Sequence, residues 1–153
     1  IGMEGGEDLV LGSPYDYEKN TLIGVPEDLP APGEPGFAKA SAAAVIEIAK
    51  CQSKVIVCGV GKSGLIASKI AATLSSVGTP SFNLSASDSS HGDLGSIQKK
   101  DVLILISYSG QTNELKNIIQ YANRNKILLI GIVSKKESVL YKASDIKLLI
   151  PKV

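Results

Sequence analysis

The chain has 153 residues, 44% of them hydrophobic and 20% charged, which suits one domain with a packed core and excludes wholesale disorder. The net charge is only +1, a single arginine stands among sixteen basic residues, and aromatic residues make up 5%, which disfavours a nucleic-acid-binding surface. The longest apolar runs, among them Val102–Ile106 and Ile127–Val133, are too short to cross a membrane, and the first residues do not form a signal peptide. We therefore expect a cytoplasmic protein that binds neither nucleic acid nor membrane.

The first 36 residues differ in kind from the rest of the chain. They carry a net charge of −7 and five of the seven prolines, whereas residues 37–153 carry a net charge of +8. The run Pro26–Pro35 fits neither a helix nor a central strand. The sequence therefore predicts a largely irregular acidic tail over 1–36 and one folded domain over 37–153.

From Phe37 onward the hydrophobic pattern predicts alternating helices and strands. In chain order these are a helix over 37–50, a strand over 54–58, a helix over 62–76, a strand over 80–84, a polar stretch over 85–95, a strand over 101–106, a helix over 113–125, a strand over 126–133, a helix over 138–143 and a strand over 146–150. Strands that are apolar on both faces and alternate with helices are typical of a parallel sheet covered on both sides. The predicted fold class is therefore an α/β three-layer sandwich with a five-stranded parallel sheet.

The loop after the first predicted strand reads Gly59-Val60-Gly61-Lys62-Ser63-Gly64 and formally matches the dinucleotide-binding pattern G-x-G-x-x-G. That function also calls for an acidic residue at the end of the next strand, where 83–85 reads Asn-Leu-Ser. A phosphate-binding P-loop fails on spacing, because Ile56 stands where its first glycine belongs. Two interpretations stay open: an anion site at the start of a helix, or a tight turn in which the serine caps the helix.

The loop after Ile106 has a similar composition. Residues 107–114 read Ser-Tyr-Ser-Gly-Gln-Thr-Asn-Glu and also precede a predicted helix. Taken alone, this loop suits an ordinary helix cap. Together the two loops could form a mostly neutral cup for one phosphate group with Lys62 as its cation, and such a cup suits a phosphomonoester better than a magnesium-bound polyphosphate.

Metal-ligating residue types are scarce. Cys51 and Cys58 do not form a ligand pair, and His91 is the single histidine. We expect no metal site, no nucleotide cofactor, and a buried, inert Cys58.

Several ordered motifs resemble those of the sugar isomerase (SIS) domain. They are GVGKSG, TLSSVGTPSF, HGDLG and ISYSGQTNE, and the resemblance extends over about residues 37–153. Within that family the sequence is most similar to arabinose-5-phosphate isomerases, of the kind that feed lipopolysaccharide synthesis. The resemblance implies a sheet of flavodoxin-like order, a sugar-phosphate ligand and a homo-oligomer, either dimer or tetramer, with sites near the subunit interfaces.

The resemblance also implies roles for individual residues. The family's phosphate-binding hydroxyls correspond to Ser63, Ser107, Ser109 and Thr112, and its catalytic groups to Lys62, Glu114 and His91. Aldose–ketose interconversion needs a base that moves a proton between C1 and C2 and groups that stabilise the enediolate and open the sugar ring. Glu114 could serve as the base, Lys62 as an electrophile and His91 in ring opening. Ordinary structural roles, such as a charge in the first turn of a helix for Glu114, remain open.

Three features depart from the family pattern. Residues 85–88 read Ser-Ala-Ser-Asp where the family has a His-Pro and a glutamate, and Gln111 stands where an acidic residue is usual. The chain also ends at Val153, directly after the last predicted strand, without the segment that supplies another catalytic glutamate in the family. The predicted function is aldose–ketose isomerisation of a phosphorylated pentose, and the alternative is a catalytically reduced phosphosugar-binding regulatory module.

Overall fold

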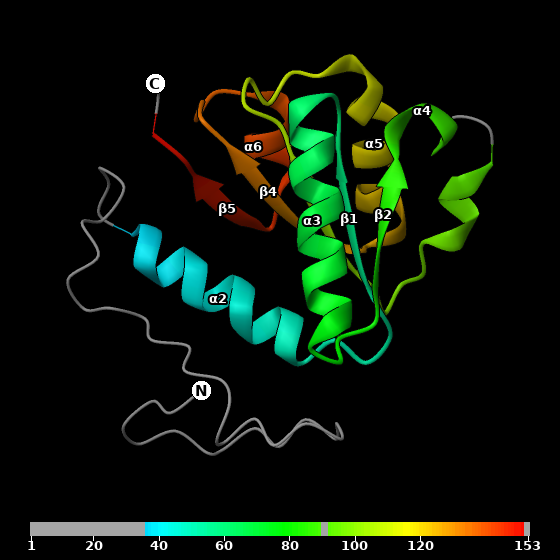
Figure 1. The fold of residues 1–153 in the computed structure, drawn as a ribbon. Helices are drawn as coiled ribbons and strands as arrows, with labels where there is room; N and C mark the ends of the chain where they lie inside the picture. The colour runs from blue at the N-terminus through cyan, green and yellow to red at the C-terminus, as the bar shows by residue number, and fades with distance from the viewer. Residues whose placement is uncertain (1–35, 90–91, 152–153) are drawn as a thin grey trace.

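The structure, a computed structural model, describes residues 36–89 and 92–151 (Figure 1). Its five strands are β1 Val55–Gly59, β2 Ser81–Ser85, β3 Val102–Ile106, β4 Leu128–Val133 and β5 Ile146–Leu149. Its helices are α2 Phe37–Ala49, α3 Lys62–Ser76, α4 Ala86–Ser89, α5 Lys116–Asn125 and α6 Val139–Ala143, with 3₁₀ turns η1 Asp93–Ser96 and η2 Asn113–Leu115. The acidic tail predicted over 1–36 lies, apart from Gly36, outside the described residues.

All five strands are parallel and lie in the order β2-β1-β3-β4-β5. This confirms the predicted α/β fold with a five-stranded parallel sheet of flavodoxin-like order. The strand order reverses at β1, which lies between β2 and β3, and ligands of such sheets bind beyond the carboxyl ends of the strands at this reversal. The register pairs Gly59 at the end of β1 with Ile106 at the end of β3, so the loops that follow these strands start side by side.

Two hydrophobic cores cover the two faces of the sheet. Val55 and Val57 of β1 pack in one core with Ala67 and Ala71 of α3, while Ile56 and Cys58 point into the other. Figure 1 shows α2 and α3 in front of the sheet and α5 and α6 behind it. Burial raises the pKa of the Cys58 thiol to about 12, which agrees with its predicted role as a small buried hydrophobe.

The structure corrects the predicted elements in two places. The helix predicted over 113–125 begins as the 3₁₀ turn η2 and becomes α-helical only at Lys116. The polar stretch 85–95 is not a plain loop, because it contains α4 and most of η1, whose Leu94 packs against the core behind the sheet. Short helical turns of this kind carry too few residues to show a period of 3.6.

A buried ion pair lies at the amino ends of β1 and β3. The Asp101 side chain is fully buried, and its Oδ2 accepts hydrogen bonds from Lys54 Nζ at 2.9 Å and from the Gln98 N–H at 2.7 Å. Burial favours the neutral acid, but hydrogen bonds from Ser53, Gln98 and Lys54, together with the Lys54 charge, outweigh it and hold the pKa of Asp101 below its usual value. This pair joins the two central strands at the end opposite the predicted site.

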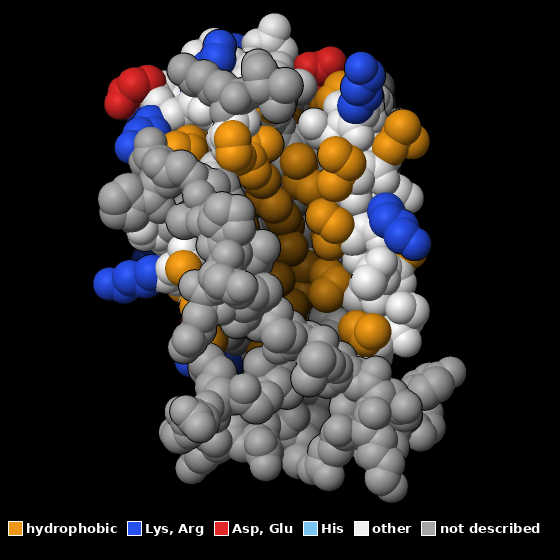
Figure 2. Space-filling model, turned by 60° about the vertical axis from the view of Figure 1, so that its left-hand side comes forward, with side chains coloured by type: hydrophobic (Ala, Val, Ile, Leu, Met, Phe, Trp, Pro, Cys, Tyr) orange, Lys and Arg blue, Asp and Glu red, His pale blue; other side chains and the backbone are white. Residues whose placement is uncertain are grey.

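An apolar furrow runs beside α3 on the face that α2 and α3 cover (Figure 2). Partly exposed hydrophobic side chains of the sheet pack against the core on this face, and they include Ile132, Ile146 and Leu148. On α3 itself, Leu65 and Ile66 are 75% and 53% exposed. Among the described residues, no helix is long and apolar enough to cross a membrane.

Candidate functional site

The first loop of the site joins β1 to α3 through glycines. A Cβ atom on Gly59 would lie 2.6 Å from the carbonyl oxygen of Ser63, so only glycine lets α3 start this close to the strand. Gly61 is the N-cap of α3 with φ 58°, and no side chain caps the helix. Ser63 as a helix cap, one of the two open interpretations, is therefore wrong: it occupies the second position of α3, partly exposed, next to an exposed Lys62.

The second loop, residues 107–112, is held together by its own hydroxyl groups. The Oγ of Ser107 accepts a hydrogen bond from the Gly110 N–H at 2.9 Å and lies 2.8 Å from Thr112 Oγ1. Ser109 Oγ accepts from the Gln111 N–H at 3.2 Å. Thr112 is the N-cap residue of η2, but its side chain makes no capping bond. Ser107 is only 2% exposed, whereas Ser109 and Thr112 are partly exposed, so these two hydroxyls are the more accessible ones.

The sheet brings the two loops together. Each starts directly beyond the paired residues Gly59 and Ile106, at the point where the strand order reverses. Both predicted loops thus meet at the edge where such sheets bind ligands. Glu114 lies in η2, directly after the second loop, and its side chain is exposed. His91, the third predicted catalytic residue, lies outside the described residues.

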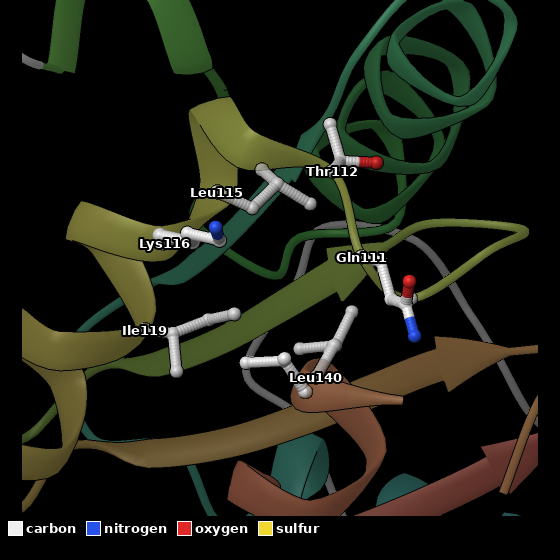
Figure 3. Close-up of a pocket in the computed structure, with 8 residues that line it drawn as sticks. Gln111, Thr112, Leu115, Lys116, Ile119 and Leu140 are labelled. Atoms are coloured by element: carbon white, nitrogen blue, oxygen red, sulfur yellow. The ribbon is translucent and has the colours of Figure 1, made fainter. Parts of the chain in front are cut away.

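A small hollow opens on the other side of the second loop, between α5 and α6 (Figure 3). Its lining is mainly apolar and includes Leu115, Ile119 and Leu140, with Gln111 and Lys116 also contributing. An apolar lining offers few donors to a phosphate group, so this hollow does not replace the predicted cup. Within residues 36–89 and 92–151, no group of three or more histidine, cysteine, aspartate or glutamate side chains could hold a metal ion.

The sequence analysis missed two serines that support the second loop from outside. Ser134 follows β4 and donates both its N–H, at 3.0 Å, and its hydroxyl, at 2.6 Å, to the carbonyl oxygen of Tyr108. Ser138, the N-cap of α6, is fully buried against Gly110, where any Cβ would overlap its side chain. The serine directly after an apolar strand was the available signal, but serines after strands are common in loops.

Comparison with known proteins places the chain in a family. Residues 47–153 match the SIS domain. The chain is 50% identical over 103 residues to the arabinose 5-phosphate isomerase KdsD of Yersinia pestis, and that match covers 67% of this chain and 31% of the relative. It is 46% identical over 97 residues to the arabinose 5-phosphate isomerase GutQ of Salmonella typhi, covering 63% of this chain and 30% of the relative.

A solved structure shows the same fold. The protein c3406 of Escherichia coli CFT073, in complex with arabinose 5-phosphate, superposes with a TM-score of 0.72 at 40% identity, and the match covers 75% of this chain and 61% of that chain. A parallel sheet with hydroxyl-bearing loops at its reversal point defines an α/β domain built to receive a small anion. The chain belongs to the SIS domain family. It spans about a third of the length of the curated isomerases that it matches.

Proposed function

We propose that this chain binds a phosphorylated pentose and interconverts its aldose and ketose forms, of the arabinose 5-phosphate and ribulose 5-phosphate type. The observation that carries this proposal is the meeting of two hydroxyl-bearing loops beyond β1 and β3. The likeness of the chain to isomerases at 50% and 46% identity supports the same class of ligand. The neighbouring structure with bound arabinose 5-phosphate supports a sugar phosphate as that ligand.

In this proposal the phosphate group is bound by the hydroxyls of the two loops and by the start of α3. The four hydroxyls are those of Ser63, Ser107, Ser109 and Thr112. Exposed N–H groups at a helix N-terminus favour an anion, and Lys62 adds a positive charge at the same place. Ser107 is the most enclosed of the four, so its bonds to Gly110 and Thr112 also fix the shape of the loop.

The proposed reaction is a proton transfer that needs no oxidant or reductant. A base, Glu114, removes the proton from C2 of the aldose, an enediolate forms, and the proton returns to C1 while the C1 oxygen is protonated and the C2 oxygen loses its proton. Lys62 stabilises the negative charge that develops on the substrate oxygen. His91 opens the sugar ring before this step.

A coupled assay of arabinose 5-phosphate conversion to ribulose 5-phosphate tests this proposal. The wild-type chain should turn over, and Lys62→Ala should lower the rate strongly while the protein stays folded. Binding of the sugar phosphate without turnover in a homogeneous sample would assign the alternative role, a phosphosugar-binding regulatory module. Neither binding nor turnover would refute both functions.

We also propose that the folded domain spans 37–153, that it forms homo-oligomers, and that it acts in the cytoplasm in supplying lipopolysaccharide synthesis. The domain boundary is supported by α2, which begins at Phe37. The oligomer is supported by the apolar furrow beside α3, because hydrophobic surface of this kind is commonly covered by a partner (Figure 2). Light scattering should therefore give a mass of at least two chains, and a monomer at micromolar concentration would contradict the oligomer.

A further inference from the structure

The second loop carries carbonyl oxygens as well as donors, and both kinds of group lie close to its ligand-binding side. A carbonyl oxygen that turned toward a bound phosphate would repel it, whereas N–H and O–H groups attract it. The fate of these carbonyls therefore decides whether the loop can bind an anion.

Three of the loop carbonyls already have donors. The Ser107 carbonyl accepts from the Gly110 N–H at 3.1 Å, within the loop. The carbonyls of Tyr108 and Gly110, which flank Ser109, accept from outside the loop: the first from the N–H and hydroxyl of Ser134, the second from the Leu140 N–H at 3.0 Å. Both outside donors belong to one segment, residues 134–140, between β4 and the first turn of α6.

We propose that Ser134 is a positioning residue that makes the second loop selective for anions by holding the Tyr108 carbonyl away from the ligand. A trans peptide is planar, so the N–H of Ser109 lies opposite the Tyr108 carbonyl and points away from Ser134. Ser134 thereby fixes the direction of one loop donor as well as one acceptor. This inference rests on the proposed phosphate-binding role of the loop, but it concerns a residue that contributes no atom to the ligand.

Ser144 provides a matched control within the same molecule. It is 4% exposed, as Ser134 is, and it also donates its N–H, at 3.1 Å, and its hydroxyl, at 2.7 Å, to one carbonyl. Its acceptor is Leu140 in its own helix, not a residue of the loop. Ser144→Ala therefore removes the same kind of bond without touching the proposed site.

The test compares Ser134→Ala, Ser134→Thr and Ser144→Ala with the wild type by two measurements. The first is titration with arabinose 5-phosphate and with inorganic phosphate. Ser134→Ala should raise Kd for both by roughly three- to tenfold, Ser134→Thr should restore it to within about twofold of wild type, and Ser144→Ala should leave it unchanged. Where turnover is measurable, the loss in Ser134→Ala should fall on KM, with kcat nearly unchanged.

The second measurement needs no ligand. Amide hydrogen exchange at Gly110, whose N–H is bonded to Ser107, should accelerate in Ser134→Ala and stay at the wild-type rate in Ser144→Ala. Wild-type binding with unchanged Kd and unchanged exchange in Ser134→Ala would overturn the role of Ser134. A wild-type chain that binds neither ligand would overturn the proposed function and the anion selectivity together, whatever the exchange rates are.

Discussion

The two ends of the central strands β1 and β3 carry polar side chains in opposite states of pairing. At the amino ends, Asp101 is fully buried and bonded to Lys54 and to the Gln98 N–H. At the carboxyl ends, Lys62 and Glu114 are exposed at the edges of two loops. A paired and buried group stabilises the fold, while an exposed group at a ligand edge contributes little to stability. Mutations at the two ends should therefore separate stability from function.

The largest effect is expected from Glu114→Gln. The amide keeps the shape of the side chain but cannot accept a proton, so turnover of arabinose 5-phosphate should fall by about 100- to 10,000-fold. The Kd for the sugar phosphate and the urea midpoint should stay near the wild-type values, because the side chain is exposed. Turnover at the wild-type rate would remove Glu114 from the proposed mechanism.

The next effect is expected from Lys62→Ala. Loss of the ammonium group should lower kcat/KM by about 100- to 1000-fold, since it removes charge stabilisation at the reacting oxygen. Because Lys62 is an exposed residue at the start of α3, thermal unfolding should change little. Lys69→Ala, an exposed lysine farther along the same helix, serves as the control and should keep its activity.

At the carboxyl edge, the sequence was sufficient to predict the fold and the loops but not their internal contacts. Gly59, Gly61 and the apolar strands have strong local patterns, so the strand–loop–helix units were predictable. The bond from Ser134 to Tyr108 joins residues 26 apart in the chain, and no local pattern reports such a pair. The enclosure of Ser107 likewise depends on how the loop folds back on itself.

At the amino edge, Asp101→Asn should reduce stability with no effect on ligand binding. At pH 7 the free energy of unfolding should fall by about 1–3 kcal/mol, because a buried hydrogen-bonded charge pair is broken. Since the pKa of Asp101 is lower in the fold than in the unfolded chain, its contribution is present above about pH 4 and is lost as the pH falls through the folded pKa.

Urea unfolding at pH 7 and at pH 3 measures both parts of this prediction. The difference between wild type and Asp101→Asn should shrink at the lower pH, because the wild-type pair is then partly protonated. An equal difference at both pH values would show that the charge of Asp101 does not contribute, and a changed Kd for arabinose 5-phosphate would show that the two ends of the strands are coupled.

The smallest effect is expected from Glu137→Gln, and it separates burial from position as the cause of the contrast. Glu137 lies between β4 and α6, one residue before Ser138, and pairs with Lys142 at 2.7 Å, but its side chain is 87% exposed. The hydrogen bond and charge of Lys142 lower the pKa of Glu137, yet water and salt screen such a pair. Stability at pH 7 and Kd should both stay at wild-type values. A loss of stability comparable to that of Asp101→Asn would mean that pairing alone, without burial, makes a charge structural in this fold.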